Sequence, residues 1–126
     1  MKKDQFIKAR NILKKTQKEM SVLLGVSLRA IHSYEQEWRN IPVHVERQIY
    51  FLLSRKNKAF QKIKPCWNVM KCSGDIRETC PAWEFRAGKL CWFINGTVCE
   101  GMAKKTWKEK MEICRKCVML ENIFAE

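Results

Sequence analysis

Apolar residues recur at helical spacing through the first half of the chain. They stand three or four positions apart, so each set lines one face of a helix. Four sets follow one another: Phe6, Ala9 and Leu13; Met20, Leu23 and Leu24; Ile31, Tyr34 and Trp38; and Val45, Ile49, Leu52 and Leu53. The pattern predicts a bundle of four to five short helices that ends near residue 56.

Local signals mark where these helices begin and end. Thr16 and Glu19 have capping-box spacing, in which each side chain accepts a hydrogen bond from the other residue's backbone N–H. Gly25 suits the left-handed end of a helix, and Ser27 is a good N-cap for the next one. Pro42 suits a first helical turn. We therefore expect a helix, a tight turn and a second helix between residues 16 and 35.

The second half has a different pattern. Residues 89–94 precede Asn95-Gly96 and predict a strand that enters a tight turn. Thr106 and Glu109 repeat the capping-box spacing and predict a last helix. The expected fold class is mainly α, with an N-terminal four- to five-helix helix-turn-helix bundle followed by a small irregular α+β domain.

Charge divides the chain at the same place. Residues 1–64 carry 15 Lys/Arg against 5 Asp/Glu, a net charge of +10, whereas residues 65–126 carry +2. We expect a helical domain over 1–56, a basic linker over 57–64 and a second domain over 65–126. A charge excess confined to one half favours a polyanionic partner for that half, and a solvated surface is the alternative.

The segment from Thr16 to Glu35 reads TQKEMSVLLGVSLRAIHSYE. It resembles the Xre/Cro phage-repressor-like helix-turn-helix family, and the resemblance extends from about Phe6 to Leu53. It implies a DNA-binding domain whose third helix enters the major groove of a duplex and that docks as a homodimer. A small helical bundle without DNA binding is the alternative. Glu37 departs from the family, which usually has glycine there, so the third helix is expected to run longer.

The same resemblance implies the DNA-contacting residues. Gln17 would contact a phosphate at a helix N-terminus, and Arg29 would read guanine through its planar guanidinium. Side chains on the third helix would project toward base edges, and Arg39 would contact the backbone beyond it. The full expected set is Gln17, Ser27, Leu28, Arg29, His32, Ser33 and Arg39.

All seven cysteines lie in the second half, which contains no histidine. They are Cys66, Cys72, Cys80, Cys91, Cys99, Cys114 and Cys117. About 60 residues rarely fold without a staple, so four of these thiolates are expected to hold zinc or an iron–sulfur cluster. The surplus of thiols favours iron–sulfur. Cys114 and Cys117 have the two-residue gap of a ligand pair, which also suits a metal-free dithiol switch.

Cys66-Trp67, Cys80-Pro-Ala-Trp83 and Cys91-Trp92, together with the final Cys-x-x-Cys, resemble the two-CW module. This bacterial cysteine-rich domain is found fused to helix-turn-helix and signalling domains. The resemblance covers about Pro65 to Met119 and supports a shared role for the cysteines.

The first ten residues lack the apolar core of a secretion signal, and no apolar run is long enough to span a bilayer. We therefore expect a cytoplasmic protein without a membrane partner, in which thiols stay reduced. No catalytic motif is present, so no enzymatic activity is expected. The predicted function is a DNA-binding transcriptional regulator whose second domain senses redox state, oxygen or metal. A DNA-binding protein with a static zinc-held scaffold is the alternative.

Overall fold

The computed structural model describes residues 1–57, 61–62, 64–69, 71, 73–94, 97–99, 102–103, 106–117, 120 and 122–124, with the backbone alone at 98–99, 102–103 and 122. The chain forms two compact units. Unit 1 comprises Met1–Asn57 with Ile123–Glu126, and unit 2 comprises Lys58–Asn122. Of the linker expected over 57–64, residues 58–60 and 63 lie outside the described residues.

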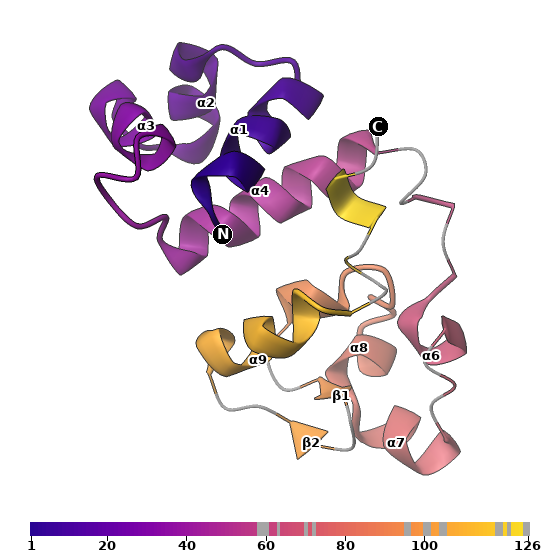
Figure 1. Cartoon of the computed structure of the whole chain (residues 1–126). Coiled ribbons are helices and arrows are strands. Elements are labelled where there is room, and N and C mark those ends of the chain that lie inside the picture. The colour runs from indigo at the N-terminus through magenta and orange to yellow at the C-terminus, as the bar shows by residue number, and fades with distance from the viewer. Residues whose placement is uncertain are drawn as a thin grey trace. The chain divides into compact units, whose positions relative to one another are not determined.

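Unit 1 is a helical bundle, as the apolar spacing predicts. Its helices are α1 (Lys3–Ile12), α2 (Gln17–Leu24), α3 (Leu28–Glu35) and α4 (Val43–Lys56). Each helix contributes side chains to one core, and α2 and α3 pack on each other across a short turn (Figure 1). The core residues that the sequence predicted and the structure buries are Phe6, Ala9, Leu13, Met20, Leu24, Ile31, Tyr34, Val45, Ile49 and Leu53.

The predicted helix ends around the turn are confirmed. The Thr16 Oγ1 accepts the Glu19 N–H at 3.1 Å, and Glu19 Oε1 accepts the Thr16 N–H at 3.1 Å. The Thr16 N–H is the main reason that the pKa of the Glu19 carboxyl lies below its usual range. Gly25 has a φ of 66° and ends α2, and Ser27 Oγ caps α3 by accepting the Ala30 N–H at 3.0 Å. Short-range chemistry therefore sets both ends of the turn.

Helix α3 ends at Glu35 and does not run longer, so this expectation is wrong. Glu37 adopts the left-handed conformation with a φ of 61° in the place of glycine. The Trp38 N–H then reaches the Ser33 carbonyl at 2.9 Å, which closes the helix with a Schellman-type bond. This bond satisfies an end carbonyl of α3 and so compensates for the left-handed backbone at Glu37.

Replacing Glu37 by glycine is expected to stabilise unit 1 by about 0.5–1 kcal/mol. A left-handed residue with a Cβ costs roughly 1–2 kcal/mol, and the extra backbone freedom of glycine in the unfolded chain offsets part of that gain. Urea unfolding followed by circular dichroism measures the change. Glu37→Ala is the matched control, because it removes the carboxylate and keeps the Cβ. Equal stability of both variants would contradict the backbone explanation.

Three apolar residues of the predicted stripes are not core residues, and one of them, Leu52, is half-buried. Trp38 is 78% exposed and Leu23 is 44% exposed. Trp38 lies beyond the end of α3, where the turn at Glu37 breaks the helical period that the prediction assumed. Leu23 lies in α2 beside the exposed Val22, at the edge of the buried face.

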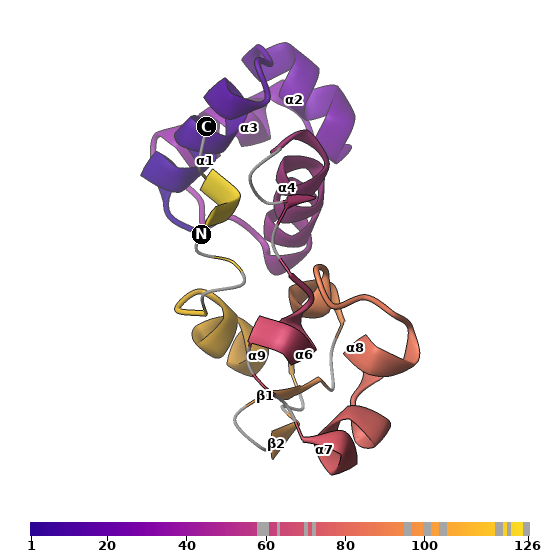
Figure 2. The same cartoon turned by 90° about the vertical axis from the view of Figure 1, so that its right-hand side faces the viewer.

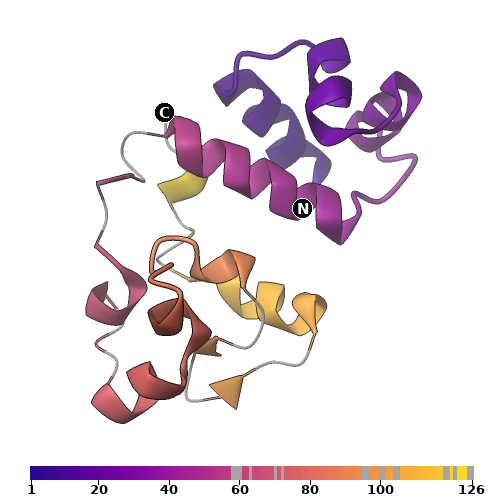
Figure 3. The same cartoon turned by 180° about the vertical axis from the view of Figure 1, so that it is seen from behind.

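Ile123 and Phe124 pack against α4 and the residue that follows it, which the sequence did not predict. The 3-10 helix η2 (Asn122–Phe124) lies beside the last turns of α4 (Figures 1 and 3). Asn57 Nδ2 donates to the Ile123 carbonyl at 3.2 Å, and the rings of Tyr50 and Phe124 meet edge to face at 6.1 Å. Ile123 is fully buried, and Ile123 and Phe124 belong to unit 1.

The described part of unit 2 consists of short helices and one short pair of strands (Figure 2). Its elements are α6 (Cys66–Val69), α7 (Gly74–Thr79), α8 (Pro81–Glu84), η1 (Cys91–Phe93), β1 (Val98–Cys99), β2 (Met102–Ala103) and α9 (Trp107–Cys114). The two strands are antiparallel, with Val98 opposite Ala103 and Cys99 opposite Met102. Because each strand has only two residues, the described part of unit 2 is mainly helical. The expected α+β character of this domain therefore has little support.

The strand predicted over residues 89–94 is wrong. Cys91–Phe93 forms a 3-10 helix, with the Phe93 N–H on the Leu90 carbonyl at 2.9 Å. A strand would send Cys91 and Trp92 to opposite faces, whereas both are buried, at 5% and 1% exposure. The helix predicted from Thr106 is confirmed, because its hydroxyl accepts the Glu109 N–H at 3.2 Å.

Candidate nucleic-acid interface and cysteine cluster

Three of the predicted DNA-contacting side chains lie together on α3. Leu28, Arg29 and His32 are all exposed, and their spacing of one, three and four positions places them on one helix face. The other face of α3 is buried and holds Ala30, Ile31 and Tyr34. Helix α3 thus presents a guanidinium, an imidazole and an aliphatic side chain to solvent, and these side chains suit guanine edges and thymine methyl groups.

The two serines of the predicted set have local roles. Ser33 was expected to project outward, and this is wrong: it is 9% exposed, and its hydroxyl donates to the Arg29 carbonyl at 3.0 Å. A short hydroxyl side chain can be buried on a helix in this way, because the preceding turn supplies its acceptor. Ser27 is exposed, and its Oγ caps α3.

Gln17 belongs to a polar network that links three helices. Its Nε2 donates to Glu35 Oε2, while Arg10 Nε and Nη2 donate to Glu35 Oε1 at 3.1 and 3.0 Å. The Glu35 side chain is 5% exposed, so this carboxylate depends on both partners. Arg10 also donates to the Lys15 carbonyl at 3.2 Å. The network holds the start of α2 against the end of α3.

Sequence reasoning missed Arg10 and Glu35. Each is a charged residue within an amphipathic helix, a position normally assigned to a solvated face. For Glu35 the available signal was its position at the end of α3, directly after the buried Tyr34.

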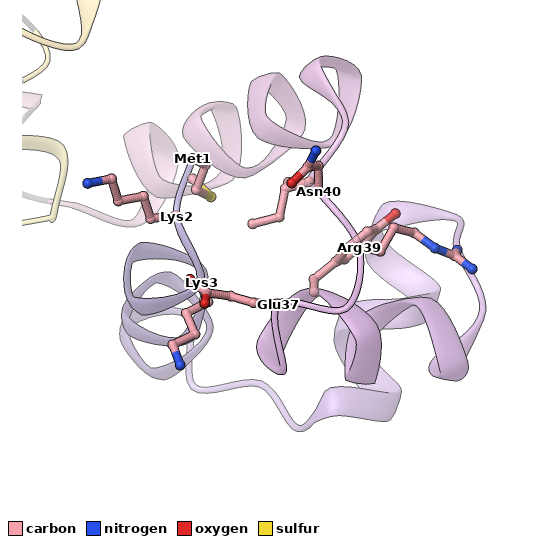
Figure 4. A pocket seen from close by; sticks show the side chains of 8 residues that line it. Met1, Lys2, Lys3, Glu37, Arg39 and Asn40 are labelled. Carbon is pink, nitrogen blue, oxygen red and sulfur yellow. The ribbon is translucent and has the colours of Figure 1, made fainter.

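Arg39 is exposed and borders a pocket of about 310 Å³. Lys2 and Lys3, at the start of α1, line the same pocket, and Lys2 and Arg39 lie on opposite sides of it (Figure 4). Glu37 is the acidic side chain among its lining residues. The three cations add positive charge beside the end of α3, and the two lysines were not among the predicted site residues.

Five cysteines have described side chains. Cys91 and Cys114 are buried, and Cys66, Cys80 and Cys117 are half-buried. Cys72, and the side chain of Cys99, lie outside the described residues. The predicted ligand roles of all seven stay predictions.

Cys66 and Cys91 lie together although distant elements carry them. Cys66 opens α6 and Cys91 opens η1, and a hydrogen bond joins their side chains. This bond from Cys91 is the main reason that the pKa of Cys66 is lowered to about 7, against the opposing effect of burial. The backbone N–H of Trp67 and the positive charge of Lys110 act in the same direction.

Lys110 comes from α9 and is 3% exposed. Its Nζ donates to the Thr97 hydroxyl. A buried ammonium is costly unless hydrogen bonds and a nearby negative charge compensate for lost water. Cys66, Cys91 and Lys110 therefore form a cluster of two thiols and one cation, which we call the thiol–lysine cluster.

The thiol–lysine cluster alone does not fit a metal ion. Within the described part of the chain, no three Cys, His, Asp or Glu side chains are grouped so as to hold one. A four-thiolate site needs four sulfur atoms around one centre, and the cluster supplies two. A zinc or iron–sulfur site that used Cys66 and Cys91 would therefore need two more sulfur atoms from elsewhere in the chain.

Comparison of the chain with family models, curated proteins and solved structures gives no match. None of the described helices combines the length and apolar character needed to cross a bilayer.

Proposed function

We propose that unit 1 binds double-stranded DNA and that the protein is a cytoplasmic transcriptional regulator without catalytic activity. The observation that carries this proposal is the outward face of α3, where Leu28, Arg29 and His32 stand together on a fixed helix. The net charge of +10 over residues 1–64 supports it, because a duplex is a polyanion. The resemblance to the Xre/Cro family points to the same function.

In the proposed complex, α3 lies in the major groove and Arg29 pairs with O6 and N7 of a guanine. Leu28 packs on a thymine methyl, and His32 contacts a neighbouring base. The first N–H groups of α2 bind a backbone phosphate. Since the Gln17 amide donates to Glu35, these backbone groups have the larger role there. Arg39, with Lys2 and Lys3, contacts a second phosphate.

Two protomers would read two half-sites, since single helix-turn-helix units of this kind dock as dimers.

The test of the DNA-binding proposal is a titration of labelled duplex with the full chain at increasing salt. The affinity is expected to fall steeply, because each neutralised phosphate releases counterions.

For unit 2 we propose a sensing role carried by its cysteines. The thiol–lysine cluster favours it, because a thiol with a lowered pKa beside a cation is a reactive thiol. A bound iron–sulfur cluster or zinc ion, held by about four of the seven cysteines, is the metal-dependent form of this proposal. A static zinc scaffold is the alternative. Elemental analysis and a visible spectrum of anaerobically purified protein separate these forms.

A further inference from the structure

Two arginine side chains of unit 2 lie against the same tryptophan ring. Arg77, in the last turn of α7, has its Cζ 5.2 Å from the centre of the Trp83 ring. Arg86 lies two residues beyond α8 and has its Cζ 4.2 Å from the same centre. Helices α7 and α8 pack on each other, which brings the two arginines to one indole (Figure 1). We call Arg77, Trp83 and Arg86 the arginine–tryptophan stack.

Packing and backbone geometry hold this stack in place. Arg86 adopts the left-handed conformation with a φ of 52°, and the N–H of the next residue reaches the Ala82 carbonyl at 2.8 Å, which closes α8. The rings of Trp67 and Trp83 meet edge to face at 4.8 Å. A Cβ on Gly88 would lie 2.7 Å from Trp67 Cζ3, so glycine leaves the room that this indole occupies.

The two guanidiniums carry positive charge that lacks compensation from nearby carboxylates. Within the described part of the chain, neither Arg77 nor Arg86 forms an ion pair. Arg77 Nε is buried and has no hydrogen-bond partner among the same residues. A buried donor without an acceptor is costly, and two guanidiniums at one ring repel each other. An anion that accepts hydrogen bonds from both side chains would relieve both costs.

We propose that Arg77 and Arg86 bind a phosphate group at the surface of unit 2. The planar guanidinium presents paired donors that match two phosphate oxygens, and one phosphate has oxygens enough for both arginines. Stacking on Trp83 restricts the guanidiniums before binding, so less side-chain entropy is lost on contact. Phe85 is 68% exposed next to Arg86 and offers an aromatic surface to the molecule that carries the phosphate.

This site goes beyond the function proposed for unit 1 and does not depend on it. The phosphate belongs either to the backbone of a nucleic acid or to a small phosphorylated compound, and both sources present the same group to Arg77 and Arg86. The experiment therefore has one arm for the group itself and a second arm for its source.

The first arm titrates the full, 15N-labelled chain with inorganic phosphate and follows it by NMR. The Nε–H signals of Arg77 and Arg86 and the indole signal of Trp83 are expected to shift and saturate together. Succinate at the same ionic strength is the control dianion, and it is expected to bind more weakly because its two carboxylates are separate planar groups.

Variants of the full chain locate the site. Arg86→Gln is expected to weaken phosphate binding about tenfold or more, because it removes a charged donor. Arg86→Lys is expected to lose part of the affinity, since it keeps the charge and loses the planar pair of donors. Lys108→Gln is the matched control, because it removes one exposed cation from α9, and it is expected to bind phosphate as the wild type does. Circular dichroism checks that each variant is folded.

The second arm measures the affinity of the same variants for a labelled duplex. A loss in Arg86→Gln but not in Lys108→Gln would identify the nucleic-acid backbone as the source, and unchanged affinity in both would identify a small compound. A chain that binds phosphate through Arg86 but binds no duplex would refute the function proposed for unit 1 and leave this site intact. Unshifted Arg77 and Arg86 signals, equal affinities for phosphate and succinate, or wild-type phosphate affinity in Arg86→Gln would each overturn the proposal.

Discussion

Replacing Arg29 by alanine is expected to weaken binding to the specific duplex by about 1–3 kcal/mol, roughly 5- to 150-fold. Arg29 is exposed on α3, on the same face as Leu28 and His32. Its planar guanidinium can donate two parallel hydrogen bonds to one guanine, and alanine can donate neither. The base preference at that position is therefore expected to relax along with the loss of affinity.

Fluorescence anisotropy with the specific duplex and a scrambled duplex measures both effects. Arg29→Lys is the matched variant, because it keeps the charge and loses the planar pair of donors. This variant is expected to keep the affinity for scrambled DNA and to lose part of the preference for the specific site. An equal loss on both duplexes in Arg29→Ala would instead identify Arg29 as a phosphate contact.

Replacing Arg10 by methionine is expected to cost about 3 kcal/mol of the free energy of unfolding of unit 1. Removing one partner of a buried ion pair leaves the other charge uncompensated. The Glu35 side chain is 5% exposed, and it would keep the Gln17 amide as a neutral donor in place of a cation. The Arg10 side chain is 21% exposed, so the cost belongs at the low end of the range for buried pairs. Urea unfolding followed by circular dichroism measures it.

The double variant Arg10→Met/Glu35→Gln is expected to recover a large part of that loss, because it removes the buried negative charge along with its partner. Lys15→Met is the matched control on a surface pair. Lys15 and Glu19 lie 4.0 Å apart with exposed fractions of 34% and 53%, and solvent screens such a surface pair, so Lys15→Met is expected to change the free energy of unfolding very little. A loss in Arg10→Met no larger than in Lys15→Met would contradict the structural role given to Glu35.

The helix-turn-helix region was the most predictable part of the molecule. Its helix ends depend on residues within three or four positions of one another, such as Thr16 with Glu19 and Ser27 with Ala30. Such short-range bonds can be read directly from a sequence. The buried stripes were predictable for the same reason, since their spacing follows from the helix period.

Prediction failed where the local period ended or where distant segments met. The helical period places Trp38 in the core only if the helix continues past Glu35, and the left-handed Glu37 ends that period. Polarity alone places Ser33 on the surface, although its hydroxyl is satisfied within α3. The return of Ile123 to α4 depends on tertiary packing and has no local signal.

The cysteines show the same limit. Spacing along the chain singled out Cys114 and Cys117, whereas the structure brings Cys66 to Cys91 through the close approach at Gly88. Sequence spacing identifies ligands or thiols that share one turn, but pairs from separate elements depend on packing. Gly88, which lies between Cys66-Trp67 and Cys91-Trp92 in the sequence, was the available signal. Only the folded structure shows that Pro65 and Trp67 approach this glycine closely.

The most direct test of DNA binding is the affinity of the full chain for a labelled duplex between about 50 and 200 mM salt. If unit 1 neutralises several phosphates, the logarithm of the binding constant is expected to fall linearly with the logarithm of the salt concentration, with a slope of about −0.9 for each phosphate contacted. A binding constant that does not change with salt, or no binding even at the lowest salt, would contradict the assignment of unit 1 as a DNA-binding domain.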